Sequence, residues 1–83
     1  MLLGIVAYTL RRLQEDVEVT VGNRIQVLRR EKGFTQDEFA LRAGLNRTHL
    51  YRLESGKQSV TLRTLKIVAD ALGVKISDLV KGL

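Results

Sequence analysis

The sequence predicts an all-α fold with five short helices from residue 20 onward, preceded by an N-terminal extension. Two observations of composition and one of pattern support this prediction. The 83 residues include no proline, which breaks helices, and 45% of them are hydrophobic, which suffices for one helical core. Apolar residues recur every three or four positions, and glycines follow several of these runs. We therefore divide the chain into residues 1–19, the extension, and residues 20–83, one domain.

The extension has the weakest pattern of the chain. Its apolar residues follow helical spacing and are Leu2, Leu3, Val6, Leu10 and Leu13. Gly4 weakens such a helix by about 1 kcal/mol relative to alanine. Val17–Val21 alternates between apolar and polar residues, which is typical of extended chain. Two interpretations remain open: an extra helix that packs on the domain or on a second subunit, and a mobile arm.

The first helix of the domain is expected to begin near Thr20 and to close at Gly33. Its buried face is predicted from the helical spacing of Val21, Ile25 and Leu28. Phe34 follows the glycine and is expected to tuck under the helical bundle.

Two short helices joined by a tight turn are expected next. Thr35 and Glu38 have the spacing of a capping box, which begins the second helix, and Gly44 ends it. Asn46 caps the third helix, and Gly56 ends it. The apolar residues of this pair are Phe39, Ala40, Ala43, Leu50 and Leu53.

The fourth helix is expected to begin after Thr61, with Ser59 as the alternative cap, and to stop at Gly73. Its apolar residues follow the helical period closely and are Leu62, Leu65, Val68, Ala69 and Leu72. Ser77 is expected to cap a last turn or two near the C-terminus.

The basic residues are concentrated in the domain. Residues 1–22 hold two arginines against three acidic residues, whereas residues 23–83 hold 12 Lys and Arg against six Asp and Glu. A basic domain is the expected electrostatic footprint of a nucleic-acid binder, and ordinary solubility charge is the alternative. The outer face of the third helix carries Arg47, Thr48, His49, Tyr51 and Arg52. A helix that is buried on one side and presents such a face on the other suits a DNA major groove.

Other function classes have little support in the sequence. There is no cysteine and one histidine, His49, so we expect no disulfide, no metal site and no cofactor. No catalytic constellation or phosphate-binding glycine loop is present, and we expect no enzyme activity. No segment is apolar for long enough to span a membrane, and the first ten residues lack the basic start of a signal peptide. We expect a cytoplasmic protein.

Together these segments resemble the helix-turn-helix domain of the Cro/C1-type phage repressors, the xenobiotic-response-element-like family. The resemblance covers about residues 21–80 and rests on Arg24–Arg29, Lys32–Gln36, Phe39–Ala40, Ala43–Leu45, Leu50, Leu53–Lys57 and Leu65–Val74. It implies a lambda-repressor-like DNA-binding domain whose recognition helix is residues 47–54. Asn46–Leu50 is also similar to the start of the recognition helix in controller proteins of restriction–modification systems, where tyrosine usually stands in place of His49.

The expected site residues follow from that recognition helix. The predicted base contacts are Arg47, Thr48, His49 and Arg52. The predicted phosphate contacts are Gln36, Tyr51, Lys57 and Ser59. Arginine can bind guanine O6 and N7 with two hydrogen bonds, whereas phosphate contacts position the protein without reading sequence. His49 as an unremarkable surface residue, and Tyr51 as a ring packed on the neighbouring helix, remain open.

Four residues are expected to act through the fold. The resemblance implies a partly buried ion pair between Arg29 on the first helix and Glu54 at the end of the recognition helix. Ala40 is expected where two helices cross closely, and Gly44 where the turn needs a positive φ.

A single recognition helix reads only a few base pairs, so we expect a homodimer on a palindromic operator of double-stranded DNA. The predicted dimer surface is Ile76, Leu79, Val80 and Leu83, and residues 1–19 are a rival or additional dimer element. No small-molecule ligand and no membrane partner are expected. A phage repressor, a restriction–modification controller, a toxin–antitoxin antitoxin and a non-DNA adaptor on the same scaffold remain open.

Overall fold

The structure is a computed structural model that describes residues 2–83, except for the side chains of residues 2, 8 and 11–16. It contains five helices in this described part: α1 Leu2–Glu31, α2 Gln36–Ala43, α3 Arg47–Glu54, α4 Leu62–Leu72 and α5 Ile76–Val80. The prediction of an all-α fold is confirmed. Two side chains of the predicted apolar pattern in the extension, those of Leu2 and Leu13, lie outside the described set.

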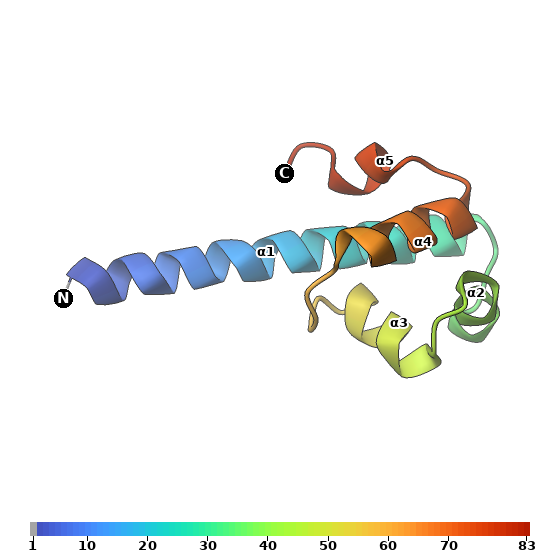
Figure 1. Cartoon of the computed structure of the whole chain (residues 1–83), viewed down its shortest axis with the longest axis horizontal. Coiled ribbons are helices and arrows are strands. Elements are labelled where there is room, and N and C mark those ends of the chain that lie inside the picture. The colour runs from blue at the N-terminus through green and yellow to red at the C-terminus, as the bar shows by residue number, and fades with distance from the viewer. Residues whose placement is uncertain (1) are drawn as a thin grey trace.

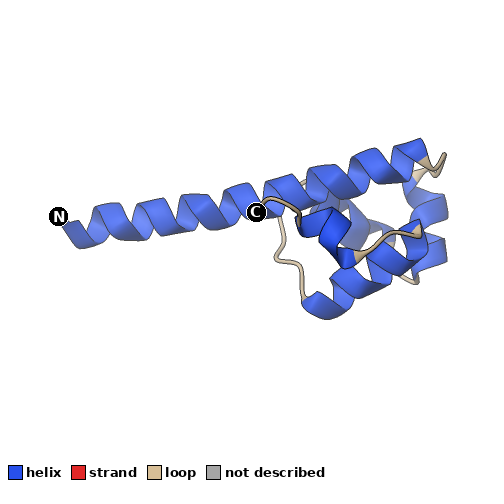
Figure 2. Ribbon diagram, turned by 90° about the horizontal axis from the view of Figure 1, so that it is seen from above, coloured by secondary structure: helices blue, strands red, loops and turns tan. Residues whose placement is uncertain are grey.

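Helix α1 is much longer than the sequence suggests. Its 30 residues correspond to about 45 Å at a rise of about 1.5 Å per residue, and the whole chain measures 48 Å along its longest axis. Figures 1 and 2 show α2–α5 gathered around the C-terminal half of α1, while the N-terminal half projects beyond them. The extension is therefore helical and continues into the first helix of the domain without a break.

The expectation of extended chain at Val17–Val21 is wrong, because α1 runs through this segment. Val17 and Val21 are four residues apart, as are Val21 and Ile25, so all three lie on one side of a helix. Val21 and Ile25 are buried in the core. The burial of this helical face outweighs the alternating pattern of a short β-branched run.

The core lies between the C-terminal half of α1 and the four short helices. Its fully buried side chains are Ile25, Phe39, Leu50, Leu53, Val68 and Leu79, so every helix contributes at least one. Phe34 is half-buried, and its ring centroid lies 5.9 Å from that of Phe39. The expectation that Phe34 packs under the bundle is confirmed.

Most helix ends follow the predicted caps. Thr35 Oγ1 accepts the Glu38 N–H at 3.1 Å, and the Glu38 carboxylate accepts the Thr35 N–H at 3.0 Å, which completes the capping box of α2. The hydrogen bond from the Thr35 backbone N–H to the carboxylate, and after it the interaction of the Thr35 hydroxyl with the same carboxylate, lower the pKa of Glu38. Gly44 ends α2 with φ 69°. Thr61, rather than Ser59, caps α4, and its Oγ1 accepts the Thr64 N–H at 3.1 Å.

The start of α5 corrects one predicted cap. The helix begins at Ile76, so Ser77 lies within it instead of capping it. The carboxylate of Asp78 accepts the Lys75 N–H at 2.9 Å and so satisfies a free donor at the helix start. An acidic residue in the first turn thus replaces the expected serine cap.

Gly22 marks the closest approach of α1 to α3. A Cβ atom at this position would lie 2.2 Å from the Leu53 carbonyl oxygen and 2.8 Å from that of Glu54. A glycine is therefore required where the backbone of α3 rests on α1. The same packing continues at Gly56, which has φ 71° and whose Cβ would meet Val19 of α1 at 2.7 Å.

Candidate nucleic-acid interface

Helix α3 is held in place by its caps and by two leucines. The Asn46 side chain accepts the His49 N–H at 2.7 Å, as predicted for an N-cap. Leu50 and Leu53 are fully buried against the core. Because these contacts occupy one side of α3, the opposite side faces solvent.

Arg47, Thr48 and Arg52 lie on that outer side and are exposed. Thr48 and Arg52 are four residues apart and therefore lie in one row along the helix. His49 is half-buried, so it lies at the edge of the exposed face and not at its centre. Three of the four predicted base-contact residues are thus free to meet a ligand.

Arg47 also makes an ion pair that the sequence does not predict. Its Nε lies 3.2 Å from Oδ1 of Asp37, the second residue of α2, and both side chains are exposed to about two thirds. An exposed pair of this kind contributes at most about 1 kcal/mol to stability. Its effect on orientation is more direct, because the pairing occupies Nε and leaves both terminal nitrogens of the guanidinium free.

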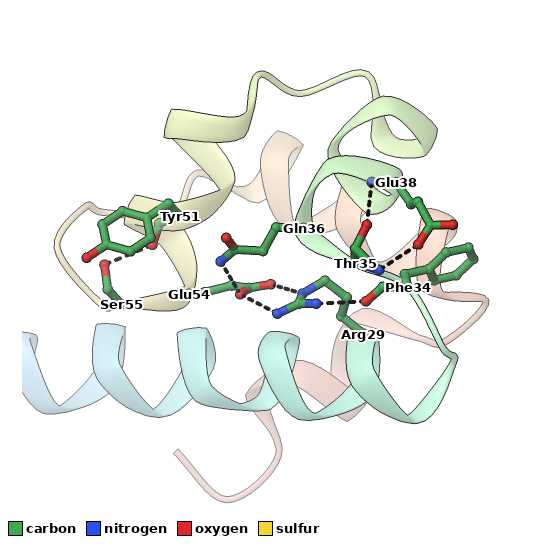
Figure 3. A network of polar contacts seen from close by, with 8 residues as sticks. All are labelled: Arg29, Phe34, Thr35, Gln36, Glu38, Tyr51, Glu54 and Ser55. Atoms are coloured by element: carbon green, nitrogen blue, oxygen red, sulfur yellow. Dashed lines mark hydrogen bonds and ion pairs between the residues drawn. The ribbon is translucent and has the colours of Figure 1, made fainter.

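A buried polar network fixes the end of α3 to α1, as Figure 3 shows. Arg29 Nε donates to Glu54 Oε2 at 2.6 Å and Arg29 Nη2 donates to Glu54 Oε1 at 3.1 Å. The side chains are 6% and 2% exposed, so this pair is more deeply buried than expected. Arg29 Nη1 also donates to the Phe34 carbonyl at 2.7 Å. The ion pair implied by the family resemblance is therefore present.

Gln36 joins this network from the first residue of α2. Its Nε2 donates to Glu54 Oε1 at 3.0 Å, so the amide links the N-terminus of α2 to the C-terminal end of α3. One amide hydrogen remains for an external acceptor. Backbone N–H groups at the start of α2 lack intrahelical partners and favour an anion at the same place.

The remaining predicted phosphate contacts, Tyr51, Lys57 and Ser59, differ in their partners within the protein. Lys57 Nζ lies 5.6 Å from the ring centroid of Tyr51, which is half exposed, so the two side chains form a cation–π pair beside the outer face of α3. Ser59 instead donates its hydroxyl to Glu18 Oε1 on α1 at 3.0 Å. A phosphate that approached Ser59 would be repelled by the Glu18 carboxylate, which already accepts the hydroxyl hydrogen. This arrangement disfavours Ser59 as a phosphate contact.

The two residues predicted to serve packing lie as expected. Ala40 is buried where α2 meets the core, and Gly44 has the positive φ that the turn between α2 and α3 requires. Gly22, which brings α1 and α3 together, has an equally specific role that we did not predict. A glycine inside an otherwise regular helical pattern is the signal that could have indicated it.

The predicted dimer residues differ in exposure, and one of them is excluded. Leu79 is fully buried in the core, so it has no surface to offer a partner, and its assignment to a dimer surface is wrong. Helix α5 packs against α4 and α1, and Leu79 is its buried residue in the common core. Ile76 and Val80 are half-buried, and Leu83 is 55% exposed.

Other kinds of site find no support in the described residues. No group of three or more His, Cys, Asp or Glu within this part of the chain could hold a metal ion. None of the helices that the structure describes has both the length and the hydropathy of a membrane span.

Comparisons with known proteins match this geometry. The profile of the family HTH_3, described as Helix-turn-helix, matches residues 25–79. The chain is 40% identical over 62 residues to the immunity repressor protein of Bacillus phage phi105, covering 75% of this chain and 43% of the repressor. It is 35% identical over 65 residues to the control protein C.MunI of a Mycoplasma species, covering 77% of this chain and 88% of that protein.

A solved structure extends the likeness to three dimensions. The crystal structure of the restriction-modification controller protein C.AhdI from Aeromonas hydrophila superimposes with a TM-score of 0.71 at 33% identity. The match covers 74% of this chain and 92% of that one. The chain thus spans less than half of the phage repressor but nearly the whole length of both control proteins.

Proposed function

The chain belongs to the helix-turn-helix family HTH_3, and we propose that it is a transcriptional regulator that binds duplex DNA sequence-specifically through α3. The observation that carries this proposal is the exposed face of α3 with Arg47, Thr48 and Arg52 on a helix fixed from behind by buried leucines. A helix fixed in this way can enter the major groove without reorganising its scaffold.

Arg47 is the main base-reading residue in this proposal. It is the first residue of α3, and its two terminal nitrogens are left free by the pairing of Nε with Asp37. Two parallel hydrogen bonds to guanine O6 and N7 contribute about 1–3 kcal/mol of discrimination. Thr48 is short enough to meet a thymine methyl, and Arg52 follows one turn later. His49, at the edge of the face, contacts a base or a phosphate beside them.

The phosphate contacts lie near the C-terminal end of the recognition helix. Gln36 offers its remaining amide hydrogen at the positive end of α2, which favours an anion. Lys57 and Tyr51 form the second contact, in the loop after α3 and the last turn of the same helix. These groups orient the protein on the DNA backbone whatever the base sequence, and they do not discriminate among bases.

Regulation by this domain acts through occupancy of an operator. One α3 helix covers only a few base pairs, so we infer that two copies bind a palindrome with half-sites about one helical turn, or about 34–36 Å, apart. The names of the similar proteins point to two settings, phage immunity and restriction–modification control. A control protein of a restriction–modification system is the setting that two of these similar proteins, C.MunI and C.AhdI, have in their names.

The experiment is a selection of bound sequences from random duplex DNA, followed by fluorescence anisotropy on the selected site at several salt concentrations. We expect one preferred palindrome, and log K falling by about 0.9 for each phosphate contact per tenfold increase in salt. The variant Arg30→Glu changes an exposed residue of α1 and serves as a control for nonspecific effects of charge on DNA binding. Flat salt dependence, or no enrichment of any sequence, would contradict the proposal.

A further inference from the structure

The projecting half of α1, residues 2–17, is named here the α1 arm. Among its described side chains, Leu3, Val6, Leu10 and Val17 are all exposed. Their spacing fits the a and d positions of a heptad, with residues 3, 10 and 17 at a and residue 6 at d, which is the pattern of a helix that packs along another surface. Most of a helix's stability in a protein comes from packing of its apolar face. A surface that covers these four side chains would therefore stabilise the arm.

An apolar groove lies where the arm joins the body of the protein, and we name it the arm groove. Its volume is about 550 Å³, and the apolar side chains around it include those of Leu10, Val17, Val60, Leu65, Val80 and Leu83. These come from α1, from α4 and the segment before it, and from the C-terminal end. Glu18 lies at the edge, where its carboxylate is already engaged by the Ser59 hydroxyl. The groove suits an apolar helix and not a nucleic acid.

We propose that the α1 arm of one copy of this chain packs against the arm groove of a second copy, and reciprocally. This inference deepens the proposed homodimer and rests on it. Leu10 and Val17 belong both to the exposed strip of the arm and to the wall of the groove. A two-fold rotation that brings one arm to the partner's groove therefore brings the partner's arm to the first groove, which closes the assembly as a dimer. A foreign partner would have no such reciprocity.

The size of the surface supports the same occupant. The arm is about 24 Å long at about 1.5 Å per residue. One helix face of this length is small beside the roughly 800 Å² per partner of a standard stable interface. Each partner supplies one arm and one groove, so the reciprocal contact doubles the surface that one helix face offers.

The arm groove also unites two predictions that seemed to compete. Val80 and Leu83 were expected in a C-terminal dimer surface, and residues 1–19 were expected as its rival. In Figures 1 and 2 the C-terminus returns to the middle of α1, and Leu83 lines the groove together with Leu10. Both segments thus contribute to one continuous surface.

The test measures the mass of the full-length protein without DNA, by sedimentation equilibrium over a range of micromolar concentrations. The arm variant is Val6→Glu with Leu10→Glu. The matched control is Leu41→Glu with Leu62→Glu, because Leu41 and Leu62 are 85% and 78% exposed on α2 and α4, outside the groove. Both double variants change the net charge by the same amount.

We expect the wild type and the control to dimerise and the arm variant to dimerise at least about tenfold more weakly, because the charges would be placed in an apolar contact. Circular dichroism provides a second measurement. The helix content of the wild type should fall when dilution converts the dimer to the monomer. The thermal midpoint of the arm variant should stay close to that of the diluted, monomeric wild type. A monomeric wild type, or an arm variant that dimerises as well as the control, would overturn the proposal. Since DNA is absent, failure of DNA binding would leave this result unaffected.

Discussion

Arg29 offers the sharpest test of how α3 is held for DNA binding. Replacing it with methionine keeps much of the side-chain volume but removes the guanidinium that donates two hydrogen bonds to Glu54 and one to Phe34. Glu54, whose side chain is 2% exposed, would keep only the hydrogen bond from Gln36. The variant therefore leaves a buried carboxylate without a cationic partner.

The expected cost follows from this burial. Removing one partner of a buried ion pair destabilises a protein by about 3–5 kcal/mol. At about 0.05–0.15 kcal/mol per residue, a chain of 83 residues has a total stability of about 4–12 kcal/mol. Arg29→Met should therefore consume a large part of the folding free energy. At about 4–8 °C per kcal/mol for a domain of this size, the midpoint of thermal unfolding should fall by at least about 12 °C.

The assay is urea unfolding followed by circular dichroism, with the double variant Arg29→Met, Glu54→Leu completing the comparison. An apolar replacement of a whole buried pair is often neutral or stabilising, so the double variant should recover most of the loss. Arg24→Met is the matched control, since Arg24 lies on the same helix and makes one hydrogen bond, to the Leu79 carbonyl at 3.3 Å. That control should cost about 1 kcal/mol.

Two results would refute this reasoning. If Arg29→Met lowers the free energy of unfolding no more than Arg24→Met does, the unpaired Glu54 carboxylate does not destabilise the protein as argued. If the double variant is as unstable as the single one, the loss comes from packing around position 29 and not from an unpaired charge. DNA binding should weaken in Arg29→Met because part of the protein is unfolded, and added operator DNA at saturating concentration should partly restore the fold.

Four further predictions concern other residues of the same scaffold. Arg47→Ala should abolish most of the discrimination between operator and random DNA in anisotropy assays while the thermal midpoint stays nearly unchanged; a sharply lower midpoint would mark Arg47 as structural. Gln36→Ala should weaken binding to all sequences alike and, through the lost bond to Glu54, cost about 1 kcal/mol of stability in urea; an effect at one base position alone would contradict the phosphate role. Gly22→Ala should destabilise by about 1–3 kcal/mol in the same assay because α3 must move away from α1, whereas Gly4→Ala, with open space around it, should not destabilise. The lowered pKa of Glu38 means that its capping contribution is present above the usual glutamate pKa and is lost as the pH falls through the lowered value; Glu38→Gln, which retains a capping-box residue, should therefore lose less stability than the wild type on acidification, and equal losses would count against this cause.

The sequence was most informative where structure is decided locally. Thr35, Asn46 and Thr61 cap their helices as predicted because a hydroxyl or carboxamide near free N–H groups acts within a few residues. Gly44 could be placed for the same reason, since a positive φ is a property of one residue. The core face of α4 was equally clear at Leu65, Val68, Ala69 and Leu72, whereas Leu62 at the start of the helix is 78% exposed although it fits the same period.

Features that depend on distant parts of the chain were harder to predict. The continuation of α1 through Val17–Val21 depends on burial against other helices, and a local reading favoured extended chain. The ion pair between Asp37 and Arg47 joins two helices whose relative placement no local spacing encodes. Leu79 has the same apolar character as Leu83, and only the packed structure shows that one is buried and the other exposed.

Helix α1 connects the two surfaces that the proposed function requires. Its C-terminal half holds α3 through Gly22 and Arg29. Its arm carries Leu10, which lies in the surface that we propose to contact a second copy. Within the proposed dimer, the distance between the two recognition helices is therefore set through a single continuous helix in each subunit.

Shortening or bending α1 between residues 10 and 22 should change the preferred half-site spacing without changing the bases read by Arg47. A prolyl substitution at Thr20 would not serve, because it would also disturb the core at Val21, whereas insertion of one helical turn in the arm, at residues 11–16, alters the spacing and leaves the packed half intact. Selection of bound sequences with this insertion variant should return the same half-sites at a new separation, and an unchanged separation would show that the arm plays no part in the dimer that binds DNA.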